Sequence, residues 1–400
     1  MASKVWSYAF LIVLEQIDIK HKRMRLFLQV FTLFLVLSLP KSLAAQATDT
    51  YAVQGVIKDS RTEETLPFAN VFFSGTTFGT VSDKDGVFTL KADGPGTYEL
   101  IVSYTGYKIF SQKIKLNAPG TREFAVEMVP EARYLGGVVV TAKKDREWKR
   151  NLGIFQRVFL GYSRNSVSCK IINEEILYFE YDEEKEVLEA YAGEPLIIEN
   201  RSLGYRLTYA LESFKIHYND GYSAFHGYPS FEELNPEEKV KKKWIKARDR
   251  AFRGSVVHFF RELYKGTAAA AGYAVSAGEM VDEVINITKD GEFNINTLVA
   301  KSTDGSQKEL FFKDLLFIEY RNESPEPGYR LSLSPEASPK ILNSAYQISW
   351  LQMPERETKA IFEESGLWVN IRDFVLEGYW SYEKIADLVP TNYQPASKDK

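Results

Sequence analysis

The sequence predicts a mostly β protein with some helix: an N-terminal β-sandwich, followed by a β-dominated α+β domain with one long amphipathic helix. Three observations predict this fold class. Short β-rich runs alternate with turn residues between positions 51 and 130. Aromatic residues make up 14% of the chain, which favours strands. Residues 235–265 carry apolar residues at spacings of three and four, which predicts one long helix.

Composition excludes several classes of protein. The 400 residues suffice for two or three domains, and 44% hydrophobic with 26% charged residues is typical of a globular chain. A formal net charge of −4 gives no basic excess of the kind that nucleic-acid binders carry. The single cysteine, Cys169, excludes an intrachain disulfide framework and a thiolate zinc site.

Residues 1–47 are predicted to be a secretory signal peptide. A basic cluster at 20–25 precedes an apolar run at 26–39, and Ala45 and Ala47 supply the small residues of a cleavage site. The alternative is a retained membrane anchor. It is disfavoured because the run is shorter than the roughly 20 residues that span a bilayer. Met24 directly precedes the apolar run, which indicates that translation starts there and that residues 1–23 are a gene-model artefact.

Residues 51–130 are predicted to form a small β-sandwich of six or seven strands, because no window shows a helical apolar period. The expected strands cover residues 51–57, 68–73, 87–90, 98–103, 110–116 and 124–128. The segment Asp83–Gly86 has two interpretations, the start of a calcium loop or a hairpin turn. The Asp-Gly pair favours the turn, since the acid pattern of a calcium loop does not continue.

Four pieces of this region carry a family resemblance. In order they are Gly55–Asp59, Leu66–Val71, Gly79–Phe88 and Tyr104–Tyr107. Their order and spacing resemble the carboxypeptidase-like regulatory domain, a transthyretin-like, seven-stranded β-sandwich common in exported proteins of Gram-negative bacteria. The resemblance implies an exported protein that is periplasmic or associated with the envelope. It implies no catalytic residues, because the module itself has none.

Residues 131–150 are predicted to be a linker that contains an apolar box. The box, Gly136–Ala142, resembles the segment that follows this module in TonB-dependent outer-membrane receptors. Too few residues remain after it for the plug and barrel of a receptor, and a long helix interrupts the alternation. The sequence therefore predicts no transmembrane barrel, and the box is either a last strand of the sandwich or part of the linker.

Residues 151–400 are predicted to form the second domain. Its expected strands cover 177–181, 187–191, 196–199, 205–209, 214–218, 283–287, 311–320, 329–333, 347–351 and 367–371. The helix of residues 235–265 is expected to begin with Asn235 as cap and Pro236 in its first turn, and to end at Gly266. Segments 194–206 and 377–390 resemble uncharacterised exported proteins that pair this sandwich with one further domain, which supports architecture only.

A search for catalytic and metal-binding motifs finds no candidate residues. Three histidines follow the signal peptide, His217, His226 and His258, and none stands in an H-x-x-E or H-E-x-x-H motif, so zinc carboxypeptidase activity is not supported. His226 is predicted to lie in a turn and Cys169 to be a buried structural thiol. No nucleophile elbow or phosphate-binding loop occurs. We therefore predict no catalytic, cofactor-binding or metal-binding residue, and no cofactor.

The helix of residues 235–265 is the one electrostatic anomaly, with ten basic and four acidic residues. One interpretation is a surface that docks on anionic lipid or a polyanion. The other, which the spacing favours, is an amphipathic helix with a buried apolar stripe and a solvated basic face.

The sequence favours a non-enzymatic exported envelope protein, whose sandwich serves as a binding or spacer module for an envelope partner or ligand. Two alternatives remain open. One is a hydrolase with an unrecognised active site in residues 151–400, which predicts converging acids or a histidine in a deep pocket. The other is membrane-surface docking through residues 235–265. The sequence names no ligand, partner or oligomeric state.

Overall fold

The computed structural model describes residues 50–131, 146–235, 237–281, 284–287, 294–302, 307–334, 337–353, 359–370 and 373–396. The predicted signal peptide and the predicted apolar box at Gly136–Ala142 lie outside these described residues. Among the helices within them, none is both long enough and apolar enough to cross a membrane.

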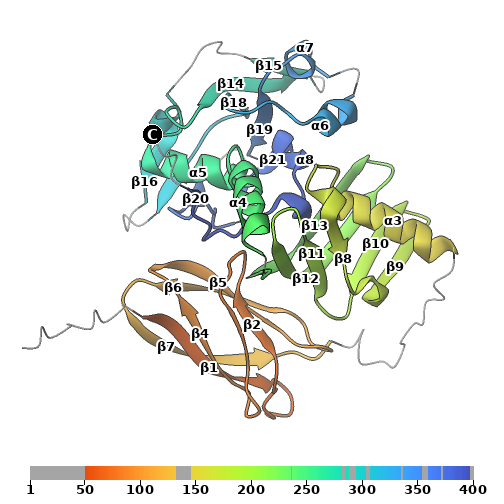
Figure 1. The fold of residues 1–400 in the computed structure, drawn as a ribbon, viewed down its shortest axis with the longest axis vertical. Coiled ribbons are helices and arrows are strands. Elements are labelled where there is room, and N and C mark those ends of the chain that lie inside the picture. The colour runs from red at the N-terminus through yellow and green to blue at the C-terminus, as the bar shows by residue number, and fades with distance from the viewer. Residues whose placement is uncertain are drawn as a thin grey trace, which may run out of the picture. The chain divides into compact units, whose positions relative to one another are not determined.

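Residues 51–128 form a seven-stranded β-sandwich, drawn in red to orange in Figure 1. One sheet has the order β4-β1-β7 and the other β3-β2-β5-β6, with β1 antiparallel to β4 and parallel to β7. Alternating apolar residues of both sheets fill the space between them. The strands are β1 (Tyr51–Asp59), β2 (Asn70–Phe73), β3 (Gly79–Val81), β4 (Val87–Ala92), β5 (Gly96–Ser103), β6 (Phe110–Leu116) and β7 (Gly120–Met128).

The Asp83–Gly86 segment is a turn between β3 and β4, but it is not the predicted hairpin turn, because β3 and β4 belong to different sheets. The Asp83 carboxylate accepts hydrogen bonds from the backbone N–H groups of Asp85 and Val87, both at 2.9 Å. Gly86 has φ +74°, a left-handed conformation that glycine adopts without steric cost. The carboxylate is therefore used inside the turn.

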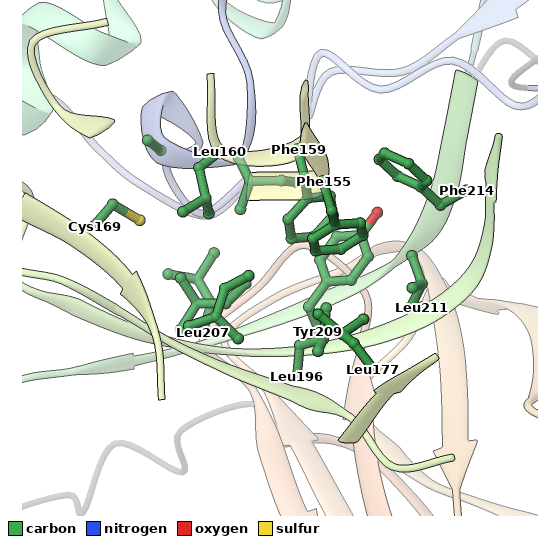
Figure 2. Close-up of a cluster of buried hydrophobic side chains, with 14 of the residues drawn as sticks. Phe155, Phe159, Leu160, Cys169, Leu177, Leu196, Leu207, Tyr209, Leu211 and Phe214 are labelled. Atoms are coloured by element: carbon green, nitrogen blue, oxygen red, sulfur yellow. The ribbon is translucent and has the colours of Figure 1, made fainter. Parts of the chain in front are cut away.

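A six-stranded antiparallel sheet and one helix follow. Helix α3 (Arg146–Leu160) packs Phe155 and Phe159 onto the sheet, where their ring centroids lie 4.6 Å from Phe214 and 5.0 Å from Tyr209 (Figure 2). The sheet has the order β8-β11-β12-β10-β9, with β13 also paired to β12. The strands are β8 (Cys169–Ile171), β9 (Leu177–Asp182), β10 (Val187–Ala192), β11 (Leu196–Asn200), β12 (Tyr205–His217) and β13 (Tyr222–Glu233).

Helix α3 was not predicted from the sequence. The predicted end of the linker at residue 150 falls inside this helix. Charged residues fill the first turn and conceal an apolar stripe: Trp148, Leu152, Phe155 and Phe159 recur at spacings of four and three and are buried.

The predicted strands at 205–209 and 214–218 are one strand, β12, with a bulge between Leu211 and Ser213. The prediction that His226 lies in a turn is wrong. His226 is inside β13, opposite Ser213, because the hairpin turns earlier, at Gly221. Pro229 does not break β13. This strand lies at an edge of the sheet, where the missing N–H group of a proline is tolerated.

The long helix predicted for residues 235–265 is two helices, α4 (Glu238–Phe252) and α5 (Val256–Lys265). Gly254 adopts φ +88°, and Ser255 begins α5 by accepting a hydrogen bond from the His258 N–H at 3.2 Å. The first helix starts at Glu238 and its N-cap residue is Glu237, not the predicted Asn235; Pro236 lies outside the described residues. Gly266 ends α5 in a left-handed conformation, as predicted.

The remaining residues form a five-stranded sheet, a three-stranded sheet and short helices around α5. Phe259, Phe260 and Leu263 of α5 are buried in their core. The five-stranded sheet has the order β15-β14-β18-β19-β21 and the smaller one β16-β17-β20. The elements are β14 (Tyr273–Val281), β15 (Val284–Ile287), β16 (Val299–Lys301), β17 (Lys308–Leu310), β18 (Leu315–Tyr320), α6 (Pro327–Ser332), α7 (Pro339–Leu342), β19 (Gln347–Gln352), β20 (Ala360–Phe362), β21 (Val375–Gly378) and α8 (Tyr379–Tyr382).

Two predicted strands in this part are wrong. Residues 329–333 fall on helix α6, which Pro327 begins, because proline suits the first helical turn. In the predicted strand 367–371, the described residues form only an isolated bridge, between Trp368 and Phe362. The overall class, mostly β with some helices, agrees with the prediction.

Candidate functional site

The three histidines lie in separate places. His217 ends β12, where its ring stacks on Tyr222 with centroids 4.4 Å apart. His226 Nε2 lies 3.2 Å from a carboxylate oxygen of Glu212, at the bulge of β12. Within the described residues, no three or more His, Cys, Asp or Glu side chains come together in a group that could hold a metal ion.

His258 is buried at the start of α5. Its Nδ1 accepts a hydrogen bond from the Gly254 N–H at 3.2 Å and lies 2.8 Å from the Tyr273 hydroxyl oxygen. Burial lowers the pKa of His258 to about 4, so the ring is neutral at physiological pH. This histidine fixes the α4–α5 break to β14.

Cys169 is buried, as predicted, in the core between α3 and the sheet (Figure 2). Burial raises the pKa of its thiol to about 12. Because the thiolate is the reactive form, this cysteine is an inert part of the core.

Four carboxyl groups gather where α8 meets the loops that follow α3 and β18, and we call Glu323, Glu326, Glu383 and Asp387 the carboxylate cluster. Burial, followed by the charges of the other three, raises the pKa of Glu383 well above its usual value. Burial also raises the pKa of Glu323. Glu326 binds Arg164 through both its guanidinium and its backbone N–H.

Asp387 is held by hydrogen bonds at both of its carboxylate oxygens. Its Oδ1 accepts hydrogen bonds from Ser163 Oγ at 2.7 Å and from Asn165 Nδ2 at 2.9 Å. Burial raises its pKa to about 6 even though these two donors oppose the shift. The carboxyl therefore ties the C-terminal segment to the loop after α3.

The carboxylate cluster is a group of buried acids of the kind that the hydrolase alternative anticipates. A neutral Glu383 carboxyl can donate a proton, which is what a general acid requires. Sequence reasoning missed the cluster because its acids come from segments about 60 residues apart and form no motif. A pocket of about 110 Å³ lies elsewhere, among Ala269, Gly272, Tyr273, Asn294, Asn296 and Arg321.

The basic residues of α4 and α5 fall into two classes. Arg248 is buried and donates to the carbonyl oxygens of Leu203 at 2.7 Å and Gly204 at 3.0 Å, while its guanidinium lies 3.9 Å from the centre of the Tyr205 ring. It also forms a 2.6 Å ion pair with Glu233. Arg248 therefore clamps α4 to the turn between β11 and β12.

Arg261 acts in the same way on α5. Its guanidinium donates to the carbonyl oxygens of Ser365 at 2.9 Å and Tyr393 at 2.8 Å, and also to that of Thr391. It thereby holds the C-terminal segment.

The lysines at the start of α4 form the second class and are exposed: Lys239, Lys241, Lys242, Lys243 and Lys246. The predicted amphipathic arrangement holds, with Trp244, Ala247, Ala251 and Phe252 buried, but Arg248 and Arg261 do not belong to a solvated face.

The sandwich is joined to the rest of the chain through backbone hydrogen bonds. The Gly75 N–H donates to the Pro229 carbonyl at 2.7 Å, and the Phe231 N–H donates to the Thr76 carbonyl at 3.0 Å. The Thr391 N–H donates to the Gly75 carbonyl at 2.7 Å. We call these contacts, together with the apolar cluster of Phe72, Ile101, Ala210 and Tyr228, the junction.

Residues 53–140 match the family model of the CarboxypepD_reg-like domain. The chain contains a CarboxypepD_reg-like domain. The match spans the seven-stranded sandwich, so it confirms the resemblance inferred from the sequence. No curated protein matches the chain.

Solved structures match the chain only weakly. A type II cohesin–X-dockerin complex from Acetivibrio cellulolyticus is 21% identical over 19% of this chain and 56% of that chain, with a TM-score of 0.16. The group B streptococcus pilus 2b backbone protein is 17% identical over 20% and 42% of the two chains, with a TM-score of 0.17. A DUF3823 family protein from Bacteroides ovatus is 9% identical over 46% and 82%, with a TM-score of 0.17. At these TM-scores the similarities assign neither fold nor function.

Proposed function

We propose that this protein is a non-enzymatic exported protein of the cell envelope, in which the CarboxypepD_reg-like domain is a rigid spacer or binding module for an envelope partner. The junction carries the proposal. Three backbone hydrogen bonds and a buried apolar cluster join the sandwich to residues of β12, β13 and the C-terminal segment. A module attached in this way keeps a fixed position relative to the rest of the chain, whereas a module on a flexible linker does not.

The basic and apolar segments within residues 1–47 support export, and the CarboxypepD_reg-like domain supports a place in the envelope by resemblance. The buried cysteine, the neutral His258 and the engaged Asp387 carboxyl all have structural roles in the fold.

Crosslinking the tagged full-length protein in its native cells, followed by mass spectrometry of the envelope fraction, tests this proposal. We expect one stoichiometric partner in the envelope fraction. Recovery of the protein in the cytosol, or of a monomer without a partner, would overturn it.

A second candidate function, docking on anionic lipid, is favoured by the exposed lysines at the start of α4. Val240 and Ile245 lie among them, each 37% exposed, so the surface offers apolar as well as cationic groups. Co-sedimentation with vesicles containing phosphatidylglycerol tests it. Charge reversal at Lys241, Lys242 and Lys243 should abolish vesicle binding, and unchanged binding would exclude this surface.

A further inference from the structure

Two hairpin turns lie side by side at one end of the six-stranded sheet. Strand β10 pairs with both β9 and β12, which brings residues 180–187 next to residues 217–222. The Tyr218 N–H donates to the Glu186 carbonyl at 3.0 Å, so the backbone itself joins the two turns. We call these two segments the tyrosine tip.

The tyrosine tip exposes aromatic rings. Tyr181 is 46% exposed, Tyr218 45% and Tyr222 50%, so three aromatic side chains are open to solvent within two adjacent turns. The rings of Tyr181 and Tyr218 meet edge to face with centroids 6.1 Å apart, and Tyr222 stacks on His217. These contacts between neighbours fix the rings before any ligand arrives.

The charge at the tyrosine tip is strongly negative. Its two segments contain six carboxylates and one lysine, Lys185. That lysine is paired with Asp182 at 2.9 Å. Glu183, Glu184 and Glu186 are exposed and form no ion pair with any residue that the structure describes. The basic side chains nearby are also engaged, Arg150 with Glu147 and Lys215 with Glu189.

We propose that the tyrosine tip binds a lysine- or arginine-bearing segment of a partner protein. An ammonium or guanidinium group is attracted both to the face of an aromatic ring and to a carboxylate, and the tip offers both within two adjacent turns. An anionic partner would be repelled by the acids. A metal ion is disfavoured because the described carboxylates nowhere form a metal-holding group.

This inference rests on the proposed function, since it names the chemistry of the partner. Tyrosine is enriched in protein interfaces because a rigid ring contributes a large contact area at a low entropic cost. The free carboxylates around the rings would steer a basic segment to the tip and set its orientation.

Fluorescence anisotropy with a labelled dodecapeptide of alternating lysine and glycine tests binding to the full-length protein at roughly 0.15 M ionic strength. We expect the Tyr181→Ala/Tyr218→Ala variant to bind at least about tenfold more weakly. Both side chains are half exposed, so the variant should fold normally, and an unchanged thermal midpoint checks this. The same peptide with acetylated lysines should not bind.

A charge-matched pair of variants separates the tip from general electrostatics. Each variant converts three exposed carboxylates to amides: Glu183→Gln/Glu184→Gln/Glu186→Gln at the tip, and Glu63→Gln/Glu64→Gln/Glu123→Gln on the sandwich. We expect only the tip variant to lose binding of the peptide. Equal loss in both variants, or no binding by the unaltered protein, would overturn the proposal.

Crosslinking in native cells distinguishes failure of this inference from failure of the proposed function. Loss of the envelope partner in the tip variant supports the inference. Recovery of the partner with the tip variant leaves the proposed function intact and overturns the inference, whereas no partner with the unaltered protein overturns the proposed function. Self-association that charge reversal at Lys241, Lys242 and Lys243 abolishes would make a second copy the occupant, and would also overturn the inference.

Discussion

The sandwich and the rest of the described chain, residues 146–396, bury different polar side chains. We call the latter part the body. The sandwich buries short groups that satisfy neighbouring backbone, such as Ser82, whose hydroxyl accepts from the Ala69 N–H and donates to the Leu66 carbonyl. Among its described residues the sandwich buries one charged side chain, Asp59, whose carboxylate accepts hydrogen bonds from the Arg61 and Thr62 N–H groups and from the Tyr107 hydroxyl. The body buries Arg248, Arg261 and Asp387, each of which joins segments far apart in the chain, and His258, which joins the α4–α5 break to the nearby strand β14. The comparison teaches that the body relies on buried charged groups more than the sandwich does.

Substitution of glycines that have a left-handed backbone conformation tests this comparison. The largest expected loss of stability is at a glycine of the body. Gly204 has φ +72°, and a Cβ there would lie 2.1 Å from the Trp244 ring. We expect Gly204→Ala to lower the free energy of unfolding by about 4 kcal/mol, through backbone strain and overpacking. Urea denaturation measures this loss.

Gly221→Ala is the matched control. Gly221 has φ +67°, and no atom lies within 4 Å of the position that a Cβ would take there. The substitution should therefore show the strain alone, about 1 kcal/mol. Equal losses in both variants would contradict the close packing of α4 on the turn.

The second prediction removes a buried charge from the body. Arg248→Met should lower the free energy of unfolding by about 3 kcal/mol, because the Leu203 and Gly204 carbonyls lose their donor. The exposed Arg206, which pairs with Glu199, serves as control, and Arg206→Met should cost less than about 1 kcal/mol. If urea denaturation gives equal losses in the free energy of unfolding for both variants, Arg248 does not clamp α4.

The third prediction concerns acid. The folded-state pKa of His258 is about 4, below its ordinary value of 6.5, so its contribution to stability is present above pH 6.5 and is lost as the pH falls. Between about pH 6.5 and pH 5 the protein should lose about 2 kcal/mol relative to His258→Asn, whose amide oxygen can replace Nδ1. Parallel urea titrations at the two pH values give this difference, and an unchanged difference would mean that His258 is not held neutral.

The contribution of Asp387 to stability should depend on pH in the opposite direction to that of His258. Its folded-state pKa is about 6, above the ordinary 3.8, so the native state retains a proton that the unfolded state releases. Stability relative to Asp387→Asn should therefore rise by about 2 kcal/mol between about pH 7 and pH 4.5. A relative stability that falls over this range would reverse the sign and contradict the burial of the carboxyl.

The smallest expected effect is in the sandwich. Phe68 has φ +61° and its side chain is 68% exposed, so it carries backbone strain with little burial in return. We expect Phe68→Gly to raise the free energy of unfolding by about 0.5 kcal/mol, since relief of strain exceeds the added entropy of the unfolded chain. Phe68→Ala keeps the strain and should give no gain. Thermal unfolding of the two variants decides whether the strain is present.

The features that sequence reasoning predicted well are local. The turn at Gly86, the helix end at Gly266 and strand 110–116 depend on residues adjacent in the chain. Helix α3 was missed because the charged side chains of its first turn conceal its apolar stripe. The break at Gly254 was missed because glycine inside a helical pattern is usually tolerated, and here Tyr320 and Gln347 from distant strands lie against it.

The candidate site depends on contacts that the sequence does not encode locally. Asp387 meets Ser163 only after α8 and α3 have packed, and the two residues are 224 positions apart. The tyrosine tip was partly visible as tyrosines at the ends of the predicted strands 177–181 and 214–218, but its continuity follows from the pairing of β10 with both hairpins. Pairing of this kind is decided by the whole sheet.

The junction also has a consequence for the order of assembly. Gly75 lies early in the chain, yet it accepts a hydrogen bond from Thr391, which is synthesised more than 300 residues later. A chain that leaves the ribosome or an export channel from its N-terminus must hold the sandwich loop open until that segment emerges. Docking of the sandwich on Thr391 therefore requires that the chain be made at least to that residue, and a copy truncated before it would leave the Gly75 carbonyl without this donor.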